Sequence, residues 1–202
     1  MAIFAAKFID PFMNKQNNRM IFSAALLIVM AAVTRYFPHP PNFTAIGAMA
    51  IFGGATISNK KLAFILPLAA LFLSDVALQL FSGTKGFYGT SQYFVYGAFM
   101  LITALSTFIK NKSAVNIVLA AVWSGIIFFV VSNFGTWVSG DIYPKTFVGL
   151  GSCFLAAIPF YQNEFFGNFA LNAIYGNLFY GGLLFGIYAI MEKRFATRQS
   201  IA

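Results

Sequence analysis

Charged side chains are scarce in this sequence. Only 9% of the 202 residues are Asp, Glu, Lys or Arg, whereas about 25% are charged in an ordinary soluble domain. Such a chain cannot cover a globule with water-compatible surface, which argues against a soluble protein. In contrast, 59% of the residues are hydrophobic, and 26 Phe, 9 Tyr and 2 Trp are spread along the chain. The sequence therefore predicts a single membrane domain.

Cysteine and histidine are scarcer still. The single cysteine, Cys153, cannot form an intrachain disulfide, and the single histidine, His39, excludes a histidine-rich metal site. The 13 Lys and Arg stand singly or in small clusters, so the net charge of +8 does not form the basic stripe of a nucleic-acid-binding protein. No nucleophile elbow, zinc-protease, P-loop or dinucleotide motif is present. We therefore expect no enzyme, no cofactor, no metal and no nucleic-acid partner.

The apolar runs predict an all-α bundle of about six membrane-spanning helices plus one external half-helix. The predicted spans are residues 21–37, 43–58, 62–81, 93–109, 113–137 and 168–191. Residues 1–20 mix aromatic and charged side chains, as in an amphipathic segment on the cytoplasmic membrane surface. The predicted membrane domain then covers residues 21–192, and residues 193–202 form a cytoplasmic tail.

Basic residues between the runs predict which side of the membrane each loop faces. An even number of spans with a cytoplasmic N-terminus places ten basic residues inside and three outside, in agreement with the positive-inside rule. The inside set is Lys7, Lys15, Arg19, Lys60, Lys61, Lys110, Lys112, Lys193, Arg194 and Arg198, and the outside set is Arg35, Lys85 and Lys145. Both termini are therefore expected in the cytoplasm.

Two apolar segments fit an ordinary span poorly. Residues 43–58 would extend about 24 Å as a helix, less than the roughly 30 Å hydrocarbon core, so this helix must be packed among others. Its Gly47, Ala50 and Gly54 share one face, which indicates close approach of neighbouring backbones. The apolar run of residues 146–160 is ended by Pro159, and a full span there would place the basic C-terminal tail outside. We therefore predict an external half-helix or re-entrant segment that protein covers.

Asp75 is the most informative single residue. It lies inside the third predicted span, where an unpaired carboxylate would be costly, so it must face a partner or water. Gln79 lies one turn further along the same helix face, which gives the external half of this helix a polar patch. An internal hydrogen bond that orders the bundle and a functional site are equally compatible with this pattern.

The first external loop is rich in proline. Three prolines within residues 38–41 hold the loop extended and stiff, so that His39, Asn42 and Thr44 are presented from a rigid segment. This arrangement favours a lid or a pocket wall. For Asn42 and Thr44 alone, capping of the second predicted helix is the simpler explanation.

Further polar and aromatic residues fall in the outer half of the predicted bundle. Asn133 and Trp137 close the fifth span, Tyr143 follows it, and Asn163 follows the half-helix. Trp and Tyr at a membrane boundary are typical of an interfacial belt. Together with Asp75 and the proline-rich loop, however, these residues predict an outward-facing pocket. Its aromatic walls and few amide, carboxylate and hydroxyl groups suit a small organic molecule better than a bare ion.

The alternative is a non-transporting membrane scaffold or assembly factor, in which the same residues only lock helices together. The two hypotheses predict different surroundings for Asp75. A solute-binding protein needs a hydrated, ligand-sized outer cavity that includes Asp75, whereas a scaffold would have it fully hydrogen-bonded in a packed bundle with no opening. An ion pathway would need polar groups that continue into the inner half of the spans, where the sequence offers few.

Several segments of the chain carry a resemblance. The most specific is residues 38–55, PHPPNFTAIGAMAIFGGA, followed by Leu66-Pro67 and Ser74-Asp75. Further matches are Phe128-Phe129, Asn133-Phe134-Gly135 with Trp137, Tyr143, Gly149-Leu150, Ile158-Pro159-Phe160 and Asn163. Over roughly residues 35–190 the chain thereby resembles a family of small, uncharacterised bacterial membrane proteins that are labelled as transport proteins. The resemblance implies a multi-pass protein of the bacterial inner membrane.

That family is similar in size, span count and layout to the substrate-binding S components of energy-coupling factor vitamin transporters, an analogy of fold. Such components bind a vitamin or related compound in an outward-facing pocket under a first-loop lid. Besides the small-molecule substrate and the lipid bilayer, the analogy implies an energising ATPase and transmembrane module as a partner. The docking pattern Ala-x-x-x-Ala is incomplete here, since Ile28 and Val29 follow Ala24 and Ala25. A solitary transporter is therefore equally open.

Overall fold

The computed structural model describes the backbone of residues 2–158 and 169–200, with the side chains of residues 18–158, 171–195 and 197. These residues form seven α-helices and one turn of 3-10 helix, and no strand. The helices are α1 (Ala2–Val33), α2 (Ile46–Thr56), α3 (Lys60–Phe81), α4 (Ser91–Ser106), α5 (Ala114–Ser139), α6 (Phe147–Ala156) and α7 (Phe169–Ser200), and η1 covers Thr34–Tyr36. The predicted all-α class is confirmed.

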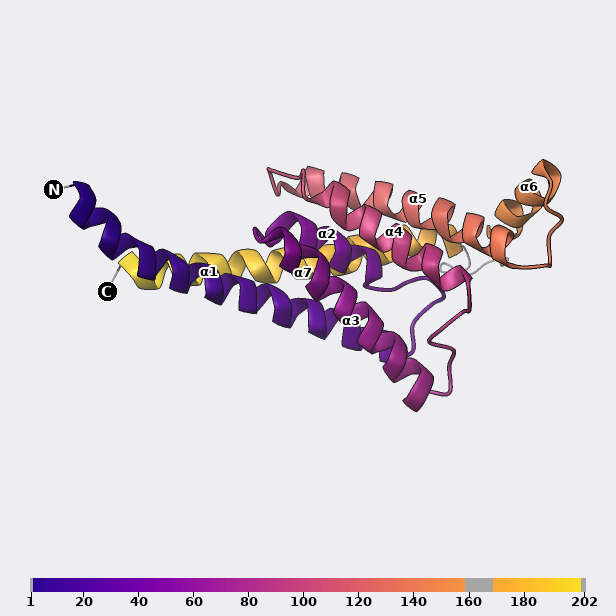
Figure 1. The fold of residues 1–202 in the computed structure, drawn as a ribbon, viewed down its shortest axis with the longest axis horizontal. Helices are drawn as coiled ribbons and strands as arrows, with labels where there is room; N and C mark the ends of the chain where they lie inside the picture. The colour runs from indigo at the N-terminus through magenta and orange to yellow at the C-terminus, as the bar shows by residue number, and fades with distance from the viewer. Residues whose placement is uncertain (1, 159–168, 201–202) are drawn as a thin grey trace.

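The helices form an elongated bundle (Figure 1). α1 and α7 lie side by side, and α1 begins at the same end of the bundle at which α7 ends. α4 pairs with α5 on one side, α3 lies on the other, and α2 lies between them. The opposite end carries η1, the loop between α3 and α4, and α6, and we call it the loop end. Helix α3 diverges from α4 and α5 toward this end.

Four helical segments are long and apolar enough to cross a membrane: Asn18–Tyr36, Lys60–Phe81, Ala114–Ser139 and Leu171–Phe195. Large apolar side chains such as Phe22 and Leu119 are more than half exposed on these helices, which suits contact with lipid. Of the other two predicted spans, α2 has 11 residues and α4 has 16. They extend roughly 16 and 24 Å, less than a hydrocarbon core of about 30 Å. The chain is thus a helical membrane protein with two short helices, of which α2 is almost wholly buried and α4 keeps an exposed apolar face.

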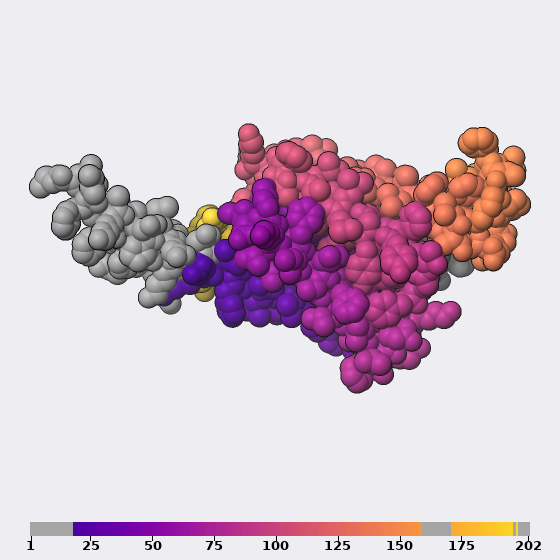
Figure 2. Space-filling view, in the orientation of Figure 1, coloured from indigo at the N-terminus to yellow at the C-terminus, as the bar shows by residue number. Residues whose placement is uncertain are grey.

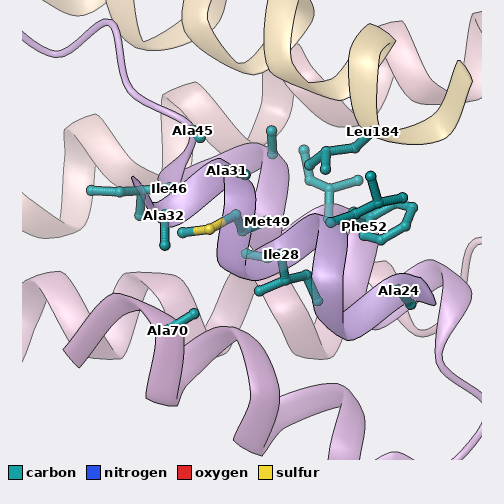
Figure 3. Packing of buried hydrophobic residues seen from close by; sticks show 14 of the residues in the cluster. Ala24, Ile28, Ala31, Ala32, Ala45, Ile46, Met49, Phe52, Ala70 and Leu184 are labelled. Carbon is teal, nitrogen blue, oxygen red and sulfur yellow. The ribbon is translucent and has the colours of Figure 1, made fainter. Parts of the chain in front are cut away.

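Helix α2 forms the centre of the bundle. Nine of its 11 residues are buried, and its Met49 and Phe52 pack among residues of α1, α3 and α7 (Figure 3). A Cβ atom on Gly54 would lie 2.4 Å from the carbonyl oxygen of Thr103 in α4, so the two backbones approach as closely as glycine allows. The prediction that this short helix is packed among others through its small residues is confirmed.

Helix α1 runs unbroken from Ala2 to Val33. The predicted surface segment, residues 1–20, and the first predicted span therefore belong to one continuous helix. The basic residues at its beginning and at the end of α7 lie at the end of the bundle away from the loop end. The assignment of residues 1–20 to the membrane surface stays a prediction.

The predicted half-helix is α6, which projects from the loop end of the molecule (Figure 2). Thr146 begins it, because its side-chain oxygen accepts a hydrogen bond from Gly149 N at 3.1 Å. Among its described residues only Gly149 and Cys153 are buried, and Phe147 is 94% exposed. The expectation that protein covers this segment is wrong for the described residues. The helix satisfies its own backbone groups, so it needs no such cover.

Candidate ligand-binding site

A cavity of about 750 Å³ lies at the loop end, where α3 diverges from α4 and α5. Its volume is typical of a site for a small organic molecule. Apolar walls come from Leu71, Leu78, Val95, Phe128 and Phe129. The polar and charged lining residues are Arg35, Tyr36, His39, Asn42, Thr44, Asp75, Ser82, Thr84, Lys85, Tyr88, Gln92, Ser132, Asn133 and Asn177. Several of these, including His39, Asn42 and Lys85, are exposed, so the cavity opens to the surface.

The proline-rich loop between η1 and α2 forms one wall of the cavity. A turn in this loop is closed by a hydrogen bond from Phe43 N to Pro40 O at 3.0 Å. Within it, Asn42 has a φ of 61°, a left-handed conformation that Asn adopts more readily than most residues. The N-cap of α2 is Ala45. Capping of α2 by Asn42 or Thr44 is therefore wrong, because the turn leaves both residues upstream of the helix start.

Contacts with α7 hold this loop in place. Asn172 Nδ2 donates a hydrogen bond to Pro41 O at 2.9 Å. A Cβ atom on Gly176 would lie 2.9 Å from both the amide nitrogen and the carbonyl oxygen of Thr44, so the loop backbone rests directly on the helix. A glycine is required at that position for the loop to approach so closely. The wall is thus a fixed part of the fold.

Asp75 lies in the wall of the cavity and is the centre of a polar network. Its side chain is 1% exposed, and its Oδ1 lies 2.7 Å from Arg35 Nη1. Its Oδ2 accepts hydrogen bonds from Gln92 Nε2 at 2.9 Å and from Tyr96 Oη at 2.6 Å. The network joins η1 and α4 to α3. A carboxylate that would be costly alone is therefore paired and hydrogen-bonded.

Arg35 fixes η1, the turn that follows α1, against α3. Its Nη1 donates to the Ser74 hydroxyl and, at 3.4 Å, to Leu71 O. Because the Nη1 hydrogens point to these two groups, the 2.7 Å approach to Asp75 Oδ1 is an ion pair, and Oδ1 has no hydrogen bond among the described residues. The Arg35 side chain is 11% exposed and lines the cavity. All the contacts that the Arg35 guanidinium makes with α3 are thus made through a single nitrogen, Nη1.

Two glutamines hold the loop between α3 and α4 over this network. Gln79 Oε1 accepts a hydrogen bond from Gly86 N at 3.1 Å, and Gln92 Oε1 accepts one from Tyr88 N at 3.4 Å. Since Gln92 also donates to Asp75, both ends of its amide are used. A Cβ atom on Gly86 would lie 1.9 Å from Asp75 O, so only glycine lets the loop pack against α3 here.

Of the nine residues that the sequence singles out, five line the cavity: His39, Asn42, Thr44, Asp75 and Asn133. Gln79 is exposed and absent from the lining, and it anchors the loop that contains Gly86. Trp137 and Tyr143 are absent from the lining. Trp137 instead donates from Nε1 to Pro144 O at 2.9 Å, so it belongs to the turn that leads to α6. Asn163 lies outside the described residues.

Sequence reasoning missed Arg35, Gln92, Tyr96 and Asn177 as members of the site. Asn177 of α7 donates to Ser124 Oγ of α5 at 2.8 Å and lines the cavity. For Arg35 a signal existed, because a lone intramembrane acid needs a cation and only three basic residues are on the predicted outer side. For Gln92, Tyr96 and Asn177 the sequence carries no such constraint.

The chain was compared with known protein families, curated proteins and solved structures. It matches a family of unknown function, DUF6580, over residues 14–199. The chain belongs to the DUF6580 family. Neither a curated protein nor a solved structure matches it. Membership in DUF6580 carries no activity with it, so the function of this member has to be argued from the cavity.

Proposed function

We propose that this DUF6580 protein binds a small organic, vitamin-like solute in the loop-end cavity and takes it up across the membrane of a bacterial cell. The observation that carries the proposal is the cavity itself. It has about 750 Å³ of space, apolar aromatic walls, and amide and charged groups at its edge. Sites for small molecules have this combination of volume and sparse polar groups. A tightly packed scaffold has no need of such a volume.

The scaffold hypothesis has one observation in its favour. Asp75 is 1% exposed and is engaged by Arg35, Gln92 and Tyr96, as expected for a residue that locks helices together. The network does lock η1, α3 and α4 together, but it does so in the wall of an open cavity. We therefore propose that Asp75 positions Arg35 and Gln92 around the cavity. The scaffold remains the alternative hypothesis.

The orientation in this proposal follows from the positive-inside rule. Lys110 and Lys112 lie in the loop between α4 and α5, at the opposite end from the cavity, together with the start of α1 and the end of α7. With those segments in the cytoplasm, the cavity opens to the outside of the inner membrane. A solute would then enter from the outside, beside the proline-rich loop.

The proposal leaves the energy source open. Ala24, Ile28, Ala31 and Ala32 of α1 are buried against the rest of the bundle (Figure 3). This face of α1 is occupied by the protein's own core, so an energising module would have to dock elsewhere. A solitary transporter and a component of a larger complex are both compatible with the remaining surface.

The test is a thermal-stability screen of the detergent-solubilised protein against vitamins and cofactor precursors. A ligand at about 100 times its Kd adds roughly 2.7 kcal/mol of stability, enough to raise the Tm by several degrees. Ser132→Trp places an indole at a position that lines the cavity, and it should abolish the shift. Ser139→Trp, on the same helix but outside the lining, is the matched control and should retain the shift.

Uptake is then measured with the radiolabelled hit in proteoliposomes. Accumulation by the wild type and by Ser139→Trp, but not by Ser132→Trp, would support transport through the cavity. If well-folded protein shows no stabilisation by any compound, the scaffold becomes the better hypothesis. Stabilisation without uptake would leave a binding component that needs a partner.

A further inference from the structure

The charged groups around the cavity are unbalanced. Two cations, Arg35 and Lys85, and one carboxylate, Asp75, line it, so its formal charge is +1 with His39 neutral. In a cleft with low-dielectric walls, an excess of one sign attracts ligands of the opposite sign. The cavity therefore favours an anion.

Asp75 does not offer its charge to a ligand. It is 1% exposed, its Oδ2 accepts two hydrogen bonds, and its Oδ1 is in contact with Arg35 Nη1. A cationic ligand would have to displace Arg35 from this carboxylate to gain an ion pair of its own. Since no other carboxylate lines the cavity among the described residues, an amine or ammonium group finds no counter-charge there.

Arg35 has hydrogen-bond donors that no described residue uses. A guanidinium has five N–H groups, and only those on Nη1 make hydrogen bonds with the described residues. The Nε and Nη2 hydrogens on the side chain that lines the cavity are the donors left for a ligand. These two positions present a parallel pair of N–H groups, which matches the two oxygens of a carboxylate. The contacts of Nη1 hold the group still for such recognition.

Lys85 supplies the uncompensated charge. It is exposed in the loop between α3 and α4, lines the cavity, and makes no ion pair or hydrogen bond with any described residue. Its loop is anchored to α3 through Gln79 and Gly86. Lys85 therefore stands at the mouth, where an exposed cation raises the rate of association with an anion more than its final affinity.

We infer that the solute is an organic acid, whose carboxylate binds Arg35 while its apolar or aromatic body lies against Phe128, Phe129 and Leu71. This inference rests on the proposed function and names the substrate class of the same site. Bound in this way, one carboxylate brings the formal charge of the cavity to zero. The aromatic walls accommodate a flat body. The Nδ2 groups of Asn133 and Asn177 donate within the protein, so their amide oxygens are the groups left to accept from its polar substituents.

The test compares compounds that share one carbon skeleton and differ only in the functional group that carries the charge. The full-length protein in detergent is screened with aromatic and heteroaromatic carboxylates, the corresponding primary amides and the corresponding amines. We expect carboxylates to raise the Tm and to bind about tenfold or more tightly than their amides, the factor of one charge-assisted hydrogen bond. Raising the salt concentration should weaken the binding of the acids and leave the binding of the amides unchanged.

Two sets of variants assign the effect to residues. Arg35→Gln combined with Asp75→Asn removes the recognising cation without stranding the buried carboxylate, and it should erase the preference of acid over amide. Lys85→Gln should lower the association rate of the acid about threefold. Lys110→Gln, which changes an exposed lysine in the loop at the other end of the bundle, is the matched control and should change nothing.

The outcomes separate this inference from the proposed function. Binding of amides as tight as that of acids, or binding of amines alone, would overturn the organic-acid assignment and leave a solute-binding protein. Retention of the acid preference in the Arg35 and Asp75 double variant would overturn the role of Arg35. If no compound of any charge binds to the folded wild type, the proposed function fails together with the inference.

Discussion

The centre of the bundle and its loop end are held together by different interactions. Around α2, nearly every residue is buried and apolar, and Gly54 lets two backbones meet. At the loop end, an ion pair, two glutamines and the backbones of two loops join helices that diverge from one another. The centre therefore depends on shape, since lipid supplies no hydrophobic drive between helices. The loop end depends on charge and hydrogen bonds.

This difference explains why the cavity lies where it does. Close packing of small residues brings the helices together around α2, whereas long polar side chains can bridge helices that lie further apart. Asp75 instead reaches Arg35 on one side and Gln92 on the other through its side-chain oxygens. A region built in this way can exchange internal contacts for a ligand, and a region built like the centre cannot.

The largest effect is expected for Arg35→Ala, which tests the dependence of the loop end on charge. The change leaves Asp75 buried without its counter-charge, a loss of about 3–5 kcal/mol for a broken buried pair. Unfolding in detergent with increasing denaturant measures it. Addition of Asp75→Asn should recover most of the loss, because no charge is then stranded. Equal stability of the single and the double variant would show that the ion pair contributes little.

A smaller effect is expected for Gly54→Leu, which tests the dependence of the centre on shape. The new side chain would begin 2.4 Å from Thr103 O, and overpacking of this kind costs about 1–3 kcal/mol. Gly151→Leu in α6 is the matched control, since a Cβ atom there meets nothing within 4 Å. We expect its stability to stay within about 0.5 kcal/mol of the wild type. Equal losses of stability in Gly54→Leu and Gly151→Leu would show that the centre does not depend on close packing at Gly54.

Much of the centre could be predicted from the sequence. The short run at residues 43–58 cannot cross a bilayer, and its glycines repeat at helical spacing, so burial among other helices follows from length and composition. The exposure of α6 could not be predicted in the same way. Both segments are short and apolar, and hydropathy does not tell a side chain buried in protein from one that faces lipid.

The loop end could be predicted only in part. The cost of a buried carboxylate predicts that Asp75 has a partner, and topology places its neighbours on the outer side. The charge rule narrows a cationic partner to three outer basic residues, but the choice of Arg35 and the contacts of Gln92 and Tyr96 follow only from how the helices are placed. Trp137 shows the opposite error, since an aromatic residue near a predicted pocket turned out to lie outside its lining.

The smallest effect is expected for Trp137→Phe, and it separates the turn before α6 from the cavity. The change removes the hydrogen bond from Nε1 to Pro144 O but keeps an aromatic ring beside Phe134. One such bond contributes about 1 kcal/mol or less in an exposed position. Affinity for a cavity ligand, measured by titration, should stay within about twofold, because Trp137 does not line the cavity. A tenfold loss would instead mean that the indole reaches the bound solute, and that the cavity extends to α6.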